Sequence, residues 1–151
     1  MSMLDVNALR QMAAEVEARK AAEEAHHREA EEAKRKALLE ELSTPVTLDE
    51  TTIERGLARV GAMVQAAAER GRTEVMAFRF PNLLTTDKGR AINVGESDWP
   101  RTLTGRPQQL YQFWQQHLAP QGFRLRAMVV DYPGGMPGDI GFFLSWGEEP
   151  R

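Results

Sequence analysis

The chain has 151 residues, of which 42% are apolar and 27% are charged, and its formal net charge at pH 7 is −3. This length and composition indicate one globular domain, or one domain with an appended segment, and exclude a disordered or fibrous protein. The sequence contains no cysteine and three histidines, which excludes disulfide scaffolds, thiolate zinc sites and cysteine nucleophiles.

The sequence has neither a membrane segment nor the pattern of a secretory leader. No apolar run approaches the roughly 20 residues that span a bilayer. The first twenty residues contain Asp5, Glu15 and Glu17 in place of an apolar core. We therefore expect a cytoplasmic protein that does not contact a membrane. Adjacent His26 and His27 point about 100° apart on a helix, so we expect no metal site and no cofactor.

The first element predicted along the chain is a long helix over residues 5–42. Between Ala13 and Leu42 the sequence has nine Ala, nine Glu and six Lys or Arg, a composition typical of stable helices. Glutamate precedes a basic residue by four positions several times, as at Glu24 and Arg28, which is the favourable order for ion pairs on a helix. At about 1.5 Å per residue, such a helix is about 60 Å long.

This helix offers few apolar side chains for an interface. The candidates are Leu9, Met12 and Val16 near its start, and Leu38 and Leu42 near its end. A heptad begun at Val6 meets Lys20 and Glu23, so we expect no continuous coiled coil through the middle. Three interpretations stay open: a solvated charged helix, self-association, and docking onto another protein. We assign residues 1–44 to an oligomerisation or docking arm and residues 45–151 to a globular domain.

A second helix follows a Ser-Thr-Pro break. Thr47 and Glu50 have the spacing of a capping box, and Gly71 stands where a left-handed C-cap is expected. Apolar residues recur between them at helical spacing, at Ile53, Leu57, Val60, Val64 and Ala67. Gly56 and Gly61 lower the helix propensity, which predicts that another backbone packs closely against this helix.

After Gly71 the apolar pattern becomes alternating, which indicates three strands, each with one buried face. The strands are predicted at residues 73–80, 123–130 and 140–146. A third helix over residues 107–118 separates the first two strands, and a Gly/Pro-rich loop joins the last two. We place Met76, Phe78 and Phe80 on the buried face of the first strand.

This order of elements predicts an α+β fold, in which the long N-terminal helix precedes a two-layer domain. Two helices cover one face of a small, mostly antiparallel three-stranded sheet. The connection between the first and second strands includes a helix, so a parallel pairing of these two strands stays open. The strand order cannot be derived from the sequence.

The segment 81–103 has no clear periodicity, and loops of this length are usually functional or disordered. Its candidate residues for a small ligand or a catalytic centre are Asp87, Arg90, Asp98, Trp99 and Arg101. The favoured alternative is structural: Ala91, Ile92 and Val94 form a short extra strand, and Trp99 closes the end of the core. No spacing in the segment matches a catalytic motif, so we assign no catalytic residue.

The charge is unevenly distributed, because residues 71–126 carry eight basic and four acidic groups. If the apolar side chains of the strands face the helices, then Arg79, Arg124 and Arg126 project from the opposite face together with Phe143. Such a face can contact protein, where arginine and aromatic side chains are enriched, or single-stranded nucleic acid. Phe143 is the one aromatic side chain there and the isoelectric point is about 5.7, so protein contact is favoured.

These observations predict a non-enzymatic protein-interaction or adaptor module. It self-associates or docks onto a partner through the long N-terminal helix and the sheet face. One alternative is a small-ligand-binding or catalytic domain centred on residues 81–103. A second alternative is binding of single-stranded nucleic acid by the arginine-bearing sheet face.

Overall fold

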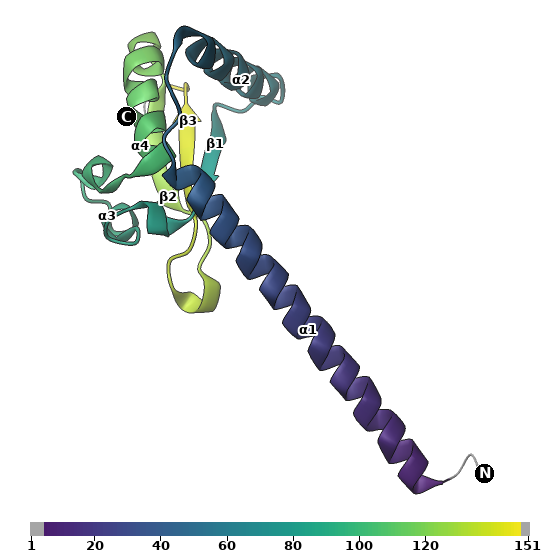
Figure 1. The fold of residues 1–151 in the computed structure, drawn as a ribbon. Coiled ribbons are helices and arrows are strands. Elements are labelled where there is room, and N and C mark those ends of the chain that lie inside the picture. Colours follow the sequence, from purple (N-terminus) through teal and green to yellow (C-terminus); the bar gives the residue numbers. More distant parts are fainter. Residues whose placement is uncertain (1–4, 149–151) are drawn as a thin grey trace. The chain divides into compact units, whose positions relative to one another are not determined.

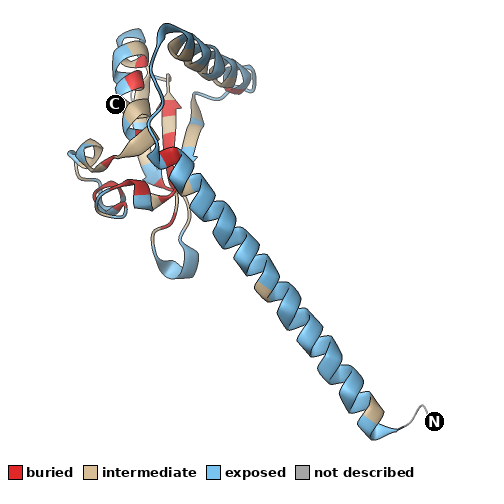
Figure 2. Cartoon of the chain, in the orientation of Figure 1, coloured by how far each residue is buried: buried red, intermediate tan, exposed pale blue. Residues whose placement is uncertain are grey.

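The computed structural model describes residues 5–148 of the chain. The chain divides into two compact units, Met1–Leu38 and Leu39–Arg151. The first unit contains most of helix α1, Val6–Ser43, which confirms the long N-terminal helix. Helix α1 is coloured as exposed along almost its whole length in Figure 2. Among residues 6–38 the two exceptions are Ala8 and Ala25, which are half-buried.

The last turn of α1 belongs to the second unit. Leu42 is 5% exposed and lies in a core cluster with Phe80 and Leu84. The hydroxyl groups of Ser43 and Thr44 donate hydrogen bonds to carbonyl groups four residues earlier, which satisfies two acceptors at the helix end. The side chain of Leu42 is therefore used by the core of its own chain and is not accessible to a partner.

Up to residue 148, the second unit contains three further α-helices and three strands, together with short 3-10 and π-helical turns (Figure 1). The helices are α2 (Glu50–Glu69), α3 (Arg90–Val94) and α4 (Gly105–Phe113). The strands are β1 (Glu74–Phe80), β2 (Arg124–Val129) and β3 (Ile140–Ser145). Strand β3 lies between β1 and β2 and is antiparallel to both. Strands β1 and β2 thus run in the same direction but are not neighbours.

The two ends of α2 are set by side-chain and glycine caps. Asp49 is the N-cap, and its carboxylate accepts a hydrogen bond from the backbone N–H of Thr52 at 2.8 Å. The predicted capping box at Thr47 is therefore wrong. Hydrogen bonding to Thr52 lowers the pKa of Asp49. Gly71 has a φ of +76° just beyond the helix, which confirms the predicted left-handed C-cap.

Helix α4 continues through a π-helical turn, Trp114–Leu118, and a short 3-10 turn, Ala119–Gln121. The ring of Phe113 lies against α2, because a Cβ atom at Gly56 would be 3.2 Å from its Cζ atom. The close neighbour of Gly56 is therefore the side chain of Phe113, and not a second backbone as predicted. The same prediction fails at Gly61, where a Cβ atom would meet nothing within 4 Å.

Helices α2 and α4 pack on one face of the sheet, which we call the core face. Phe113 and Leu118 form a buried cluster with Leu144 of β3, and Ile53 and Val60 of α2 pack against this cluster. A second cluster continues the core toward the other end of the strands. Its buried members are Leu42, Phe80, Leu84, Ile92, Leu103, Val129, Ile140 and Phe142. The two-layer α+β fold predicted from the sequence is confirmed.

A β-bulge in β1 changes which side chains reach the core. Val75 pairs with Leu144 and Phe78 pairs with Phe142, so one extra residue, Ala77, lies between Met76 and Phe78. The bulge turns Val75 toward the core face and Met76 toward the opposite face, where Met76 is 41% exposed. The assignment of Met76 to the buried face is therefore wrong.

Candidate interaction surface

The face of the sheet opposite the helices, which we call the open face, combines arginine and apolar side chains. The strand register places three rows of residues on it. The rows are Glu74, Ser145 and Arg124; Met76, Phe143 and Arg126; and Arg79, Gly141 and Met128. Arg79, Arg124, Arg126 and Phe143 thus share the face on which the sequence placed them.

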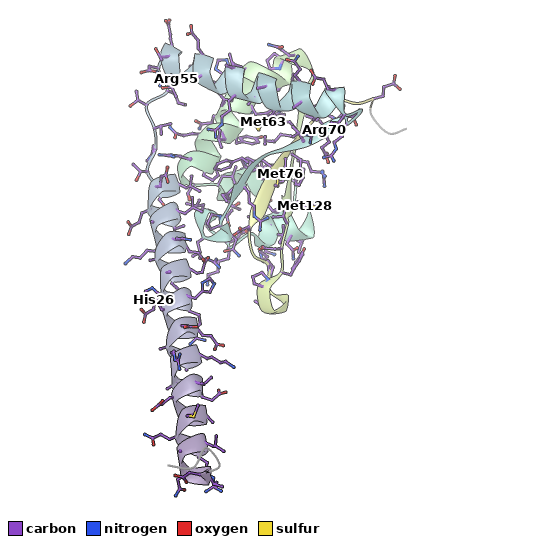
Figure 3. The ribbon with its side chains drawn as sticks, turned by 90° about the vertical axis from the view of Figure 1, so that its right-hand side faces the viewer. His26, Arg55, Met63, Arg70, Met76 and Met128 are labelled. Carbon is purple, nitrogen blue, oxygen red and sulfur yellow. The ribbon has the colours of Figure 1, made fainter. Side chains whose placement is uncertain are left out.

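Apolar side chains form the centre of the open face. A Cβ atom at Gly141 would lie 2.9 Å from the ring of Phe143, 2.9 Å from a methyl group of Val130 and 3.0 Å from the sulfur of Met76. These side chains converge over Gly141 and bury it. Met76 and Met128, both labelled in Figure 3, remain 41% and 39% exposed. The apolar side chains at the centre of the open face therefore pack closely around Gly141, and their outer surfaces remain accessible to solvent.

Arg79 connects the open face to the loop between β2 and β3. Its guanidinium Nη2 lies 3.1 Å from the carboxylate of Asp131, and its Nε lies 3.0 Å from that of Asp139. The hydrogen bond to Asp139, followed by the attraction of both carboxylates, raises the pKa of Arg79 above its ordinary value. Arg79 is therefore held in place by its own chain.

The other two arginines of the open face also have partners within the chain. Arg126 donates to the carboxylate of Glu74 at 2.9 Å, and its guanidinium carbon lies 4.9 Å from the centre of the Phe143 ring. Arg124 donates to the carbonyl oxygen of Gly147 at 2.8 Å. These contacts fix the arginine side chains on the sheet, and nearby carboxylates balance two of the three positive charges.

The segment 81–103 is organised by its own hydrogen bonds. The carboxylate of Asp87 accepts hydrogen bonds from the backbone N–H groups of Gly89 and Ala91 at the start of α3. Arg90 pairs with Glu96 at 3.3 Å on the exposed surface. The extra strand predicted here is wrong, because residues 90–94 form helix α3. The side chains of Asp87 and Arg90 therefore both have partners within their own segment.

The remaining candidates of this segment lie in and beside the 3-10 turn Trp99–Thr102, in which the backbone N–H of Arg101 donates to the carbonyl oxygen of Asp98 at 3.0 Å. Trp99 packs edge-on against Tyr111, with ring centres 5.6 Å apart, and also contacts Phe142 of β3. Its predicted role in closing the end of the core is confirmed. Asp98 and Arg101 are exposed and form no ion pair within residues 5–148. Within residues 5–148 no ion pair joins two of the five candidates, and the small-ligand site stays a prediction.

A set of exposed apolar residues that was not predicted from the sequence lies at the end of the domain where β2 leads into β3. Its members, Leu83, Val94, Tyr132 and Met136, are each more than half exposed. The hydroxyl group of Tyr132 donates to Asn93 beside Val94 at 3.0 Å, and the side chain of Asn82 beside Leu83 donates to the carbonyl oxygen of Pro137 at 2.8 Å. We call this set the apolar end. Its residues come from a 3-10 turn, the end of α3 and the loop between β2 and β3, so no periodic pattern in the sequence marks them as a set.

Neither metal chemistry nor a membrane segment is evident in the described part of the chain. Within residues 5–148 there is no group of three or more His, Asp and Glu side chains that could hold a metal ion. No helix in this range combines the length and the apolar character needed to cross a bilayer. Comparison with family models, characterised proteins and solved structures gave no match to the chain.

Proposed function

We propose that this chain is a self-associating protein-interaction module that uses the open face of its sheet as the contact surface. The observation that carries the proposal is the solvent-accessible apolar centre formed by Met76, Met128 and Phe143. Methionine, aromatic and arginine side chains are enriched where proteins meet, and the open face combines all three.

The ion pairs of the open face favour protein over nucleic acid as the partner. A phosphate group would compete with Glu74 for Arg126, and with Asp131 and Asp139 for Arg79. Phe143 is the one aromatic side chain in the three rows, whereas single-stranded nucleic acid is usually held by several stacking rings. The net charge of −3 opposes the electrostatic attraction that nucleic-acid binding requires.

A second copy is favoured over a foreign partner for two reasons. The open face carries both charge signs in adjacent pairs, so two copies can meet without a net repulsion. The chain also exposes a further apolar set away from the sheet, at Leu9, Met12 and Val16 of α1. A two-fold arrangement of such copies closes on itself and gives a defined dimer.

The test is light scattering on the full-length chain over a concentration series. We expect the average mass to rise above that of the monomer, and we expect Met128→Glu to return it to the monomer because the interface would have to bury an added charge. Met136→Glu is the matched control, since Met136 is 69% exposed and lies outside the open face. A chain that stays monomeric, or an oligomer that Met128→Glu leaves intact, contradicts the proposal.

A further inference from the structure

The first turns of α1 present a stripe of large apolar side chains. Val6, Leu9, Met12 and Val16 are between 41% and 60% exposed, and the i, i+3 and i+4 spacings of the last three align them on one side of the helix. Between Val16 and Leu38 the helix carries alanine, histidine and charged side chains and no other large apolar one. Covering the N-terminal stripe would therefore remove more apolar side-chain surface from water than covering any other part of the described first unit.

We propose that this stripe on one copy of the chain covers the open face of the sheet in a second copy. The inference rests on the proposed self-association and names the element that occupies the surface. A sheet with helices on one face is stabilised when a further helix covers its other face, because both apolar surfaces leave water. The core face already has α2 and α4, whereas the open face leaves Met76 and Met128 accessible.

The dimensions of the two surfaces agree. From Leu9 to Val16 a helix rises about 10 Å, at about 1.5 Å per residue. The three strands of the sheet span about 10 Å between β1 and β2, at about 4.8 Å per strand spacing. The stripe is thus long enough to lie across the apolar centre, from Met76 on β1 over Phe143 to Met128 on β2.

The charges select the first turns of α1 over its middle. Residues 5–20 contain three acidic and three basic groups, so this segment is neutral, as is the set of arginines and carboxylates on and beside the open face. Residues 21–33 contain five glutamates and one arginine. Laid on the open face, this segment would add uncompensated negative charge to a set of charges that is already balanced, and it has no large apolar side chain to cover Met76, Phe143 and Met128.

The absence of cysteine from the chain allows a direct test by site-specific cross-linking. Full-length Met12→Cys is mixed with full-length Met128→Cys and treated with a short bismaleimide. We expect a covalent heterodimer that forms at least tenfold faster than in a mixture of Met12→Cys with Met136→Cys. Met136 is more exposed than Met128, so random collisions would give the opposite order. Equal thermal melting of the variants confirms that all of them are folded.

Three outcomes overturn the inference. If Met12→Cys cross-links to position 136 faster than to position 128, the stripe binds the apolar end. If the two rates are equal, the stripe binds no specific surface. The absence of any cross-link shows that the stripe does not reach the open face. A cross-link within one chain of a Met12→Cys/Met128→Cys variant, at dilutions where mixtures of the single variants do not react, shows that the stripe covers its own sheet and not that of a second copy.

The failure of this inference is distinguishable from the failure of the proposed function. If Met128→Glu abolishes self-association but positions 12 and 128 do not cross-link, then the open face is an interface with a different occupant. Leu9→Glu gives a second readout, for which we expect at least a tenfold weaker dimer. Ala18→Glu is its matched control, because Ala18 lies on the opposite side of the helix from Leu9, and we expect it to leave the dimer unchanged.

Discussion

The two faces of the sheet are built from alternate residues of the same three strands, but only the core face is covered by helices of the same chain. On the core face Phe142 is 2% exposed and packs against the rings of Phe78, Phe80 and Trp99 within a buried cluster. On the open face its neighbour Phe143 lies under the guanidinium of Arg126 and beside Met76. One face thus completes the fold within the chain, whereas the other is ordered but left accessible, as an association surface must be.

Substitutions of the adjacent residues Phe142 and Phe143 are expected to differ most in their effect on stability. Phe142→Ala removes a fully buried ring, so we expect it to lower the free energy of unfolding by about 3–5 kcal/mol. Phe143→Ala removes a half-buried ring and one cation–π contact, for which we expect a loss of about 1 kcal/mol. Urea denaturation of both variants measures the difference. Equal losses would show that the two faces contribute alike to the fold.

The same contrast exists between two leucines at the end of α1. Leu42 is 5% exposed in the core, whereas Leu38, one turn earlier, is 42% exposed. We expect Leu42→Ala to lower the free energy of unfolding by about 2–4 kcal/mol and Leu38→Ala by less than about 1 kcal/mol. Thermal denaturation of both variants, followed by the signal of the aromatic side chains in the second unit, measures both losses of stability. A small effect at Leu42 would contradict its place in the core.

Glycines on the open face and on α2 provide a third contrast. Gly141→Ala places a methyl group 2.9–3.0 Å from three side chains, so we expect a loss of about 1–3 kcal/mol in the free energy of unfolding. Gly61→Ala meets nothing within 4 Å inside a helix, and we expect a gain of about 0.5–1 kcal/mol from helix propensity. Chemical denaturation measures the change in the free energy of unfolding for both variants. If Gly141→Ala does not lower this free energy, the apolar centre is loosely packed.

The smallest expected effect concerns pH. The hydrogen bond from Thr52 lowers the pKa of Asp49 in the folded chain, so its contribution to stability is fully present above the unfolded pKa and is lost as the pH falls through the folded value. Asp49→Ala should therefore destabilise α2 at neutral pH by more than it does in acid. Asp49→Asn, which keeps a capping oxygen, is the control. A pH-independent difference between Asp49→Ala and the unchanged chain contradicts this explanation.

Much of the second unit follows from local patterns in the sequence. The alternation of apolar residues placed each strand to within one residue of its observed ends, and it correctly assigned Arg79, Arg124, Arg126 and Phe143 to one face. The bulge at Ala77 was not predictable, because Val75 and Met76 are both apolar and either can face the core. Sequence alone also does not encode the strand order, which depends on contacts between distant residues.

The polar segment 81–103 was the hardest part to interpret from sequence. Its five-residue helix α3 is too short to show a period, and its ends are set by glycines with positive φ at positions 89 and 95. The apolar end was not predicted for a related reason, since its side chains come from a 3-10 turn, the end of α3 and the β2–β3 loop, which are distant in the sequence. Leu42 was predicted to lie in an interface because the spacing of apolar residues on a helix does not distinguish a contact with the core of the same chain from a contact with a partner.

Methionine oxidation tests the central claim, that the open face is covered when two copies associate. Dilute peroxide oxidises exposed methionines, and mass spectrometry of the full-length chain reports the rate at each one. We predict that Met76 and Met128 oxidise several-fold more slowly at high protein concentration than at low concentration, while the rate at Met136 does not change. Rates at Met76 and Met128 that are independent of protein concentration would contradict the account.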